Sequence, residues 1–198
     1  MPPINRDTRS PDRQRDKPLN GGASFSLRNR LFRLLWNTTW LLLASWTPPP
    51  LHPWRRFLLK LFGARIGSMS DVRGSARVWS PRNLIMGDRA IIAEKADCYN
   101  QALISIGDRT IISQKAYLCA SGHDVDDREF ALIKRPITIG ARAWVATDAF
   151  VGPGSVLEDG AVLGARAVCV GTLAANTIYV GNPARPLRKR DTHGDHAS

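Results

Sequence analysis

A six-residue periodicity in residues 137–190 constrains the fold more than any other feature of the chain. One apolar or small side chain recurs every six residues, at Ile139, Val145, Val151, Leu157, Leu163 and Cys169. Four residues after each of the first five comes a small side chain: Ala143, Ala149, Ser155, Ala161 and Ala167. An α-helix repeats every 3.6 residues and a strand alternates every two, so neither element gives a period of six. A short strand followed by a tight turn does, and coils of such units stack into a hexapeptide parallel β-helix.

The same period extends back to residue 63. The apolar positions predicted to point inward are Ile66, Val72, Val78, Met86, Ile92, Cys98, Ile106, Ile112 and Leu118. Small residues are again expected at the corners: Ser70, Ala76, Ala90, Ala96, Thr110, Ala116 and Gly122. The register slips by two residues near Leu84 and Gln101, as it does where an insertion forms a loop at a corner. After residue 136 the hexads are expected to continue without a break to Ala174, so the sequence predicts a mainly β domain over residues 63–185.

The segments outside the hexads complete the predicted organisation. Residues 1–24 are rich in Pro, Arg, Asp and Gly and are expected to form a disordered basic tail. Residues 25–62 are expected to be helical, with Ser26 as the N-cap of the first helix and Gly63 as the end of the second. Residues 121–136 contain no hexad and are expected to be a functional loop, and residues 186–198 a basic C-terminal tail.

The formal net charge of +11 favours partners that are anionic. Nucleic acid is one partner of a basic chain, but the sequence contains no helix-turn-helix, zinc-finger or aromatic RNA-binding pattern, and we expect no nucleic acid. Anionic lipid headgroups or a phosphorylated ligand would explain the same charge. At the C-terminal end of the hexads, the cluster of Arg185, Arg188, Lys189 and Arg190 is either a solubilising cap or an anion site.

The first predicted helix has two interpretations. It carries Arg28, Arg30 and Arg33 near its start and tryptophans further along. It would either pack on the β-helix or a neighbouring subunit, or rest on the inner leaflet of the inner membrane as a peripheral contact. No signal peptide is recognised, and the apolar stretch over residues 34–46 is too short to span a bilayer. We therefore expect a cytoplasmic protein and leave the peripheral membrane contact open.

Few residues are suited to metal binding or catalysis. The three cysteines form no CxxC arrangement and are expected to be small buried hydrophobes. Of the four histidines, only His123 lies within the solenoid, so we expect no metal, and a site like the histidine-bound zinc of γ-class carbonic anhydrases is excluded. His123 is either a general base, since the unperturbed pKa of a histidine side chain lies near physiological pH, or a surface histidine that caps a turn.

Several motifs together resemble a known family. They are the hexads, Ser121-Gly122-His123-Asp124, Ile137-Thr138-Ile139-Gly140, Trp144, and the ending Gly181-Asn182-Pro183-Ala184-Arg185. This combination resembles the hexapeptide-repeat acetyltransferases, and most of all the WcaF-like O-acetyltransferases of colanic acid biosynthesis, which are related to galactoside and maltose acetyltransferases. The resemblance covers about residues 27–190 and includes the helical segment before the hexads.

The resemblance implies a fold, an activity and an assembly. The fold would be a left-handed parallel β-helix, and the protein a homotrimer that binds acetyl-CoA as co-substrate in a groove between neighbouring prisms. His123 matches the family's general base, which would assist direct acetyl transfer to a sugar hydroxyl in surface polysaccharide biosynthesis. The acceptor would be a sugar or a lipid-linked glycan.

Other residues match binding positions of the family. Trp144 and Thr147 would lie on the wall of the groove, and Gly164 and Ala165 would offer backbone groups to the pantetheine arm. Arg185 and Arg188 would contact the nucleotide end of the cofactor. The candidate acceptor contacts are Tyr99, Asn100 and the preceding Asp97.

Two departures from the family pattern leave alternatives open. Val170-Gly171 stands where the family often has Thr-Lys, and Asp97-Cys98 stands where relatives often carry larger apolar residues. The acceptor would alternatively be a free small sugar, an oligosaccharide or serine. A third interpretation is a β-helix scaffold without catalytic activity.

Overall fold

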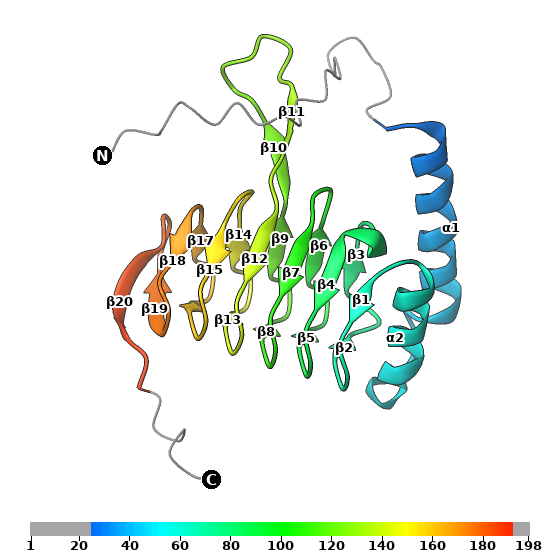
Figure 1. The fold of residues 1–198 in the computed structure, drawn as a ribbon, viewed down its shortest axis with the longest axis horizontal. Coiled ribbons are helices and arrows are strands. Elements are labelled where there is room, and N and C mark those ends of the chain that lie inside the picture. Colours follow the sequence, from blue (N-terminus) through cyan, green and yellow to red (C-terminus); the bar gives the residue numbers. More distant parts are fainter. Residues whose placement is uncertain (1–24, 192–198) are drawn as a thin grey trace.

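The computed structural model describes residues 25–191 (Figure 1). The tail expected over residues 1–24 lies outside the described residues, as do His193 and His196. The described part consists of two α-helices followed by a stack of triangular coils, in which the strands before residue 177 have two or three residues each. Successive strands of one coil lie on three different faces, so the chain winds a three-sided prism.

Each face of the prism is a sheet in which a strand pairs in parallel with the equivalent strand one coil away. The first face contains β1 (Arg65–Ile66), β4 (Leu84–Met86), β7 (Ile104–Ile106), β12 (Ile137–Ile139), β15 (Val156–Leu157) and β18 (Thr172–Leu173). The second face contains β2 (Asp71–Val72), β5 (Ile91–Ile92), β8 (Ile111–Ile112), β13 (Trp144–Val145), β16 (Val162–Leu163), β19 (Thr177–Val180) and β20 (Arg185–Lys189). The third face contains β3 (Arg77–Val78), β6 (Asp97–Tyr99), β9 (Tyr117–Cys119), β14 (Phe150–Val151) and β17 (Val168–Cys169).

The inward column of side chains is the core. All the apolar positions predicted to point inward are buried, because parallel pairing places each of them directly above its equivalent in the coil below. The corner residues are buried as well, since the chain turns too tightly there for a large side chain. Burial raises the pKa of the Cys98 thiol to about 12, which keeps this cysteine protonated and inert. The predicted fold class is confirmed: a mainly β, left-handed parallel β-helix preceded by a short helical segment.

Two details of the predicted register were wrong. Gly122 is not at a corner, because it lies in a strand that leaves the prism. The last hexad step is also shorter than expected: Leu173 pairs with Leu157 only four residues after the inward Cys169. The final coil is therefore smaller than those before it.

The interruption at residues 121–136 is a β-hairpin. Its strands β10 (Ser121–His123) and β11 (Leu132–Lys134) pair antiparallel. The hairpin leaves the prism at the edge between the third and first faces, and Figure 1 shows it projecting from the stack. At its base Arg135 N donates to Ala120 O at 3.0 Å, and the chain re-enters the first face with Ile137 paired to Ile104. The insertion therefore leaves the register of the coils intact.

The helical segment closes the first coil. It contains α1 (Leu27–Leu43), η2 (Pro49–Leu51) and α2 (His52–Leu61), and a second short 3₁₀ turn, η3 (Pro81–Asn83), follows within the solenoid. Ser26 caps α1 as predicted, with its hydroxyl accepting from Asn29 N at 3.3 Å. Trp36 Nε1 donates to Val78 O at 2.8 Å and Trp40 Nε1 to Gly74 O at 3.0 Å. One side of α1 thus packs on the β-helix.

The other end of the prism is closed by β20, which pairs antiparallel with β19. The tail expected from residue 186 is therefore part of a strand as far as Lys189. All five residues of β20 are exposed, and three of them are basic: Arg185, Arg188 and Lys189.

Arg55 joins the helical segment to the first coil. Its side chain is fully buried, and its Nε donates to Val72 O at 2.7 Å. Its guanidinium also bonds to Asp71 Oδ1 at 3.0 Å and to the chain between the two helices, where it contacts Thr47 Oγ1 at 2.9 Å and Pro48 O at 2.8 Å. A buried guanidinium is stable here because every one of its nitrogens has a hydrogen-bond partner.

We predict that Arg55→Ala lowers the free energy of unfolding by about 3–5 kcal/mol, since it takes a donor from Asp71 Oδ1 and from several buried carbonyls, while Arg73 keeps its bond to Asp71 Oδ2. Denaturant-induced unfolding measures the change. Lys60→Ala, at an exposed position of the same helix, should change it by no more than about 0.5 kcal/mol. Similar losses in the two variants would contradict the assigned role of Arg55.

Candidate active site

His123 lies on the hairpin, exposed at the end of β10. Its Nδ1 lies 2.7 Å from the Phe130 carbonyl oxygen. A carbonyl only accepts hydrogen bonds, so Nδ1 must carry the proton, and the lone pair of the neutral ring is on Nε2. A histidine held in this tautomer is suited to take a proton from an incoming hydroxyl.

The acidic residues of the hairpin hold its loop in shape. Asp127 Oδ1 accepts from Glu129 N at 2.8 Å, and Asp124 Oδ1 accepts from Asp126 N at 3.2 Å. These bonds from side chain to nearby backbone stabilise turns. Among residues 25–191 no three histidine, cysteine or acidic side chains come close enough together to hold a metal ion.

Trp144 lies on the outer surface of the second face. Its ring is half exposed, and its Nε1 donates to Ser113 Oγ, one coil away, at 2.8 Å. This bond fixes the orientation of the indole and leaves an apolar plane facing outward. The ring can therefore serve as a wall against a ligand lying along this face.

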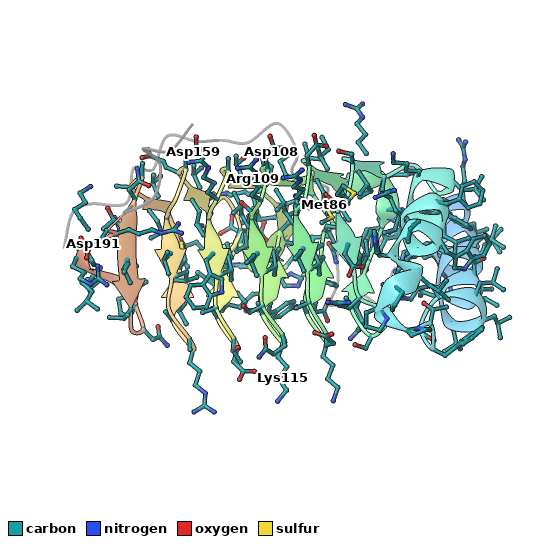
Figure 2. The ribbon with its side chains drawn as sticks, turned by 90° about the horizontal axis from the view of Figure 1, so that it is seen from below. Met86, Asp108, Arg109, Lys115, Asp159 and Asp191 are labelled. Carbon is teal, nitrogen blue, oxygen red and sulfur yellow. The ribbon has the colours of Figure 1, made fainter. Side chains whose placement is uncertain are left out.

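The turns that follow β13 and β16 stack at the edge between the second and third faces, where Figure 2 shows Lys115 pointing outward. Thr147 O accepts from Arg166 N at 3.0 Å, so the two turns are bonded to each other. A Cβ at Gly164 would come within 2.9 Å of Val180 Cγ1, which favours glycine there. Ala165 follows in the same turn and is exposed. We call this row of stacked turns the cofactor edge.

The two candidate arginines lie at different points along β20. Arg185 pairs with Val180, at the end of β19 that reaches the cofactor edge. Arg188 pairs with Ile178, further from that edge, and its Nη1 lies 3.3 Å from Asp191 Oδ2. Trp144, the stacked turns and Arg185 therefore follow one side of the prism, and Arg188 lies apart from them.

A single chain does not bring His123 to the cofactor edge. The hairpin leaves the prism between the third and first faces, whereas the stacked turns lie between the second and third faces. A site that uses both needs surfaces from two neighbouring chains.

Two of the candidate acceptor residues line a pocket of about 360 Å³ between α1 and the third face. Asp97 and Tyr99 contribute to it, together with Trp79, Arg33 and Arg77. Burial raises the pKa of the Asp97 carboxyl, and the nearby Arg77 guanidinium, 3.2 Å away, partly opposes the shift. The ring of Tyr99 meets Trp79 edge to face at 6.2 Å, so aromatic surface and charged groups share the pocket wall.

Asn100, the third candidate acceptor residue, does not face this pocket. Its side chain is fully buried: its Oδ1 accepts from Ser80 N at 2.9 Å, and its Nδ2 donates to Ser80 O at 2.7 Å. The amide is thus bonded to the backbone of the preceding coil, and the expected contact of Asn100 with sugar hydroxyls stays a prediction.

Sequence analysis missed two residues of the pocket. The guanidinium of Arg33, on α1, stacks on the ring of Trp79 with 4.3 Å between its Cζ and the ring centroid. The sequence shows Arg33 as a basic residue near the start of the first helix, but residue spacing alone does not place that helix over the third face. Trp79 follows the inward Val78, so the alternation of side chains along a strand predicts that its ring points outward.

No protein-family model matches the chain, but individual proteins do. The chain is 41% identical over 156 residues to the Escherichia coli (strain K12) protein named as a colanic acid biosynthesis acetyltransferase, WcaF, covering 79% of this chain and 86% of the relative. A maltose O-acetyltransferase from Clostridium difficile 630 has a similar structure, with a TM-score of 0.76 and 21% identity over 84% of this chain and 90% of its own. A galactoside acetyltransferase in complex with coenzyme A also has a TM-score of 0.76, with 22% identity over 85% of this chain and 86% of its own.

The three-sided prism, together with the identity to a named acetyltransferase, places the chain in the class of hexapeptide-repeat acyltransferases. Within that class, the identity over most of both chains shows that it belongs to the family of WcaF-like acetyltransferases.

We predict a pH-dependent effect of Asp97→Asn on stability. Because the pKa of Asp97 is raised in the folded state, its stabilising contribution is present below the ordinary aspartate pKa and is lost as the pH rises through the raised value. Asparagine does not ionise, so the variant should gain stability relative to the parent between about pH 4 and pH 7. Thermal unfolding at both pH values measures this, and a difference between the proteins that stays constant with pH would contradict it.

Proposed function

We propose that the protein transfers an acetyl group from acetyl-CoA to a sugar hydroxyl in surface polysaccharide biosynthesis, with His123 as general base. The observation that carries this proposal is the bond from His123 Nδ1 to Phe130 O, which leaves Nε2 unprotonated. The kinship to WcaF and the coenzyme A complex of the similar galactoside acetyltransferase support the choice of donor and acceptor class.

In the proposed reaction His123 Nε2 takes the proton from the acceptor hydroxyl as its oxygen attacks the thioester carbonyl. A hydroxyl is a weak nucleophile at neutral pH, so this assistance is needed. The carbon–sulfur bond then breaks, and the imidazolium returns its proton to the leaving sulfur to give free coenzyme A. The acetyl group passes directly to the acceptor, and the catalytic gain comes from holding both substrates together and from the base.

The proposed assembly is a homotrimer. In one chain His123 and the cofactor edge lie on different edges of the prism. Packing the hairpin of one prism against the cofactor edge of its neighbour would unite them in a groove for acetyl-CoA. Trp144 and Thr147 would line its wall, Gly164 and Ala165 would face the pantetheine arm, and Arg185 would pair with a phosphate at the nucleotide end. Arg188 would add a weaker contact there.

For the acceptor we propose a lipid-linked glycan. The pocket beside Tyr99 and Asp97 supports a sugar, because aromatic rings provide apolar surface for a sugar ring and a carboxylate accepts bonds from hydroxyls. A free small sugar, an oligosaccharide or serine would use the same base and donor, and an acceptor screen with the purified protein distinguishes them.

His123→Ala should lower kcat by about 100-fold or more, because it removes the base and leaves substrate binding in place. Steady-state transfer assays with acetyl-CoA measure it. Val125→Ala, two residues along the same exposed loop, is the control and should keep normal activity. Near-normal turnover in His123→Ala would mean that another group is the base.

Arg185→Ala should raise the KM for acetyl-CoA by about tenfold, through loss of a charge-assisted bond to phosphate, with little change in the KM for the acceptor. Arg188→Ala should have a smaller effect, since that side chain lies further along β20 and is paired with Asp191. Titration of each substrate at saturating levels of the other separates the two constants. Equal effects of the two substitutions would contradict the proposed position of the nucleotide end.

A further inference from the structure

The side of α1 that faces away from the prism carries a row of exposed leucines, which the exposed Thr38 interrupts once. Trp36 and Trp40 define the packed side, and at 3.6 residues per turn the leucines fall on the opposite side. They are Leu27, Leu31, Leu34, Leu35, Leu41 and Leu42, each at least 60% exposed. We call this row the leucine stripe. A large exposed apolar surface of this kind on a folded chain marks an interaction site.

The second helix and the connecting segment enlarge this apolar surface. Trp46 is exposed after the end of α1, and Phe57 and Leu61 are exposed on α2. The indole of Trp54, on α2, stacks on Phe57 and donates from Nε1 to Leu43 O at 2.8 Å, which ties the two helices together. Figure 1 shows both helices side by side at the first-coil end, and Figure 2 shows side chains there projecting away from the prism. The surface is therefore a broad rigid face and not a groove.

The charge around this face is of one sign. Residues 25–70 contain no Asp or Glu and seven basic residues: Arg28, Arg30, Arg33, Arg55, Arg56, Lys60 and Arg65. Arg55 is buried and paired with Asp71, so it adds nothing to the charge of this face. Arg28 and Arg30 are exposed at the start of α1, one on either side of the leucine stripe, and Lys60 is exposed on α2. Leucine flanked by tryptophan and basic residues is the composition of a helix that lies in a membrane interface.

We propose that the leucine stripe and the adjoining face of α2 bind the surface of a membrane containing anionic lipids. A second copy of the chain would bring like charges together across this face, whereas anionic headgroups would neutralise them. Within residues 25–191 neither helix combines the length and the apolar character needed to cross a bilayer, so α1 would lie flat on its surface.

The pocket beside Asp97 and Tyr99 opens next to this face. Leu41 belongs to the leucine stripe and also lines the pocket, on the side opposite the third face. If the proposed function holds, the sugar of a lipid-linked acceptor would enter the pocket while its lipid stays in the bilayer. Binding of the protein to lipid does not depend on that step.

Co-sedimentation of the full chain with vesicles tests the proposal. One set contains phosphatidylcholine alone and the other includes about one third phosphatidylglycerol, so that apolar and electrostatic contributions separate. The protein should partition onto the anionic vesicles. L34Q/L41Q, which removes two leucines without changing charge, should weaken partitioning by about 30-fold or more. R28Q/R30Q should weaken it by about fivefold per arginine on anionic vesicles, and much less on phosphatidylcholine.

L187Q is the matched control, because Leu187 and Leu31 are both 63% exposed and Leu187 lies at the opposite end of the prism, on β20. Its partitioning should equal that of the parent, and thermal unfolding should show that all the variants are folded.

No binding of the parent to anionic vesicles would overturn the proposal, as would equal losses in L34Q/L41Q and L187Q. If the parent does not bind vesicles and L34Q/L41Q dissociates the assembly, the proposal is wrong and the face is an interface between copies of the chain. None of these results depends on acetyl transfer, so they are separate from the tests of His123 and Arg185.

Discussion

Pairing between coils provides hydrogen-bond partners for the backbone of the strands inside the stack, but it leaves the first and last coils open on one side. The rest of the structure depends on how these two ends are closed. An open end exposes backbone donors, acceptors and the inward apolar column. At the first coil, two indole nitrogens and the Arg55 guanidinium donate to carbonyls of that coil. At the last coil, β20 pairs with β19 and presents a basic outer edge. The first end is closed by a helix with tryptophans on its packed side and leucines on its outer side. The last end is closed by an exposed strand with three basic residues.

The coils of the prism form a rigid support, and the candidate functional residues lie on its edges and insertions. The inward column is nearly uniform from coil to coil, whereas each edge carries its own turns. His123 is displaced from the prism by the hairpin, the cofactor candidates lie along a different edge, and the acceptor pocket needs α1 as its second wall. Each proposed substrate therefore contacts a part of the chain that the repeat alone does not specify. This division explains why the fold is shared with sugar acetyltransferases at only 21–22% identity.

The sequence predicted the repeated part of the structure well, because a period of six with a small residue at each corner leaves one way to bury the apolar column. It predicted the Ser26 cap and the place of the interruption for similar local reasons. It could not predict the hairpin strands, since no period marks them, nor the short step to Leu173. The hydrogen bonds of the buried Arg55 and Asn100 side chains could not be predicted, because burial of a polar side chain depends on backbone groups brought close by the fold. The family match placed Asn100 near an acceptor, whereas its amide is used within the wall of the prism.

The way the hairpin is inserted has a consequence for how such proteins diversify. Ile137 resumes pairing with Ile104 as though the intervening residues were absent, and a backbone bond from Arg135 N to Ala120 O closes the base of the hairpin. Selection can therefore lengthen, shorten or replace the hairpin without disturbing a single coil. His123 and the loop that carries it therefore form a unit that can change while the coils of the scaffold stay the same.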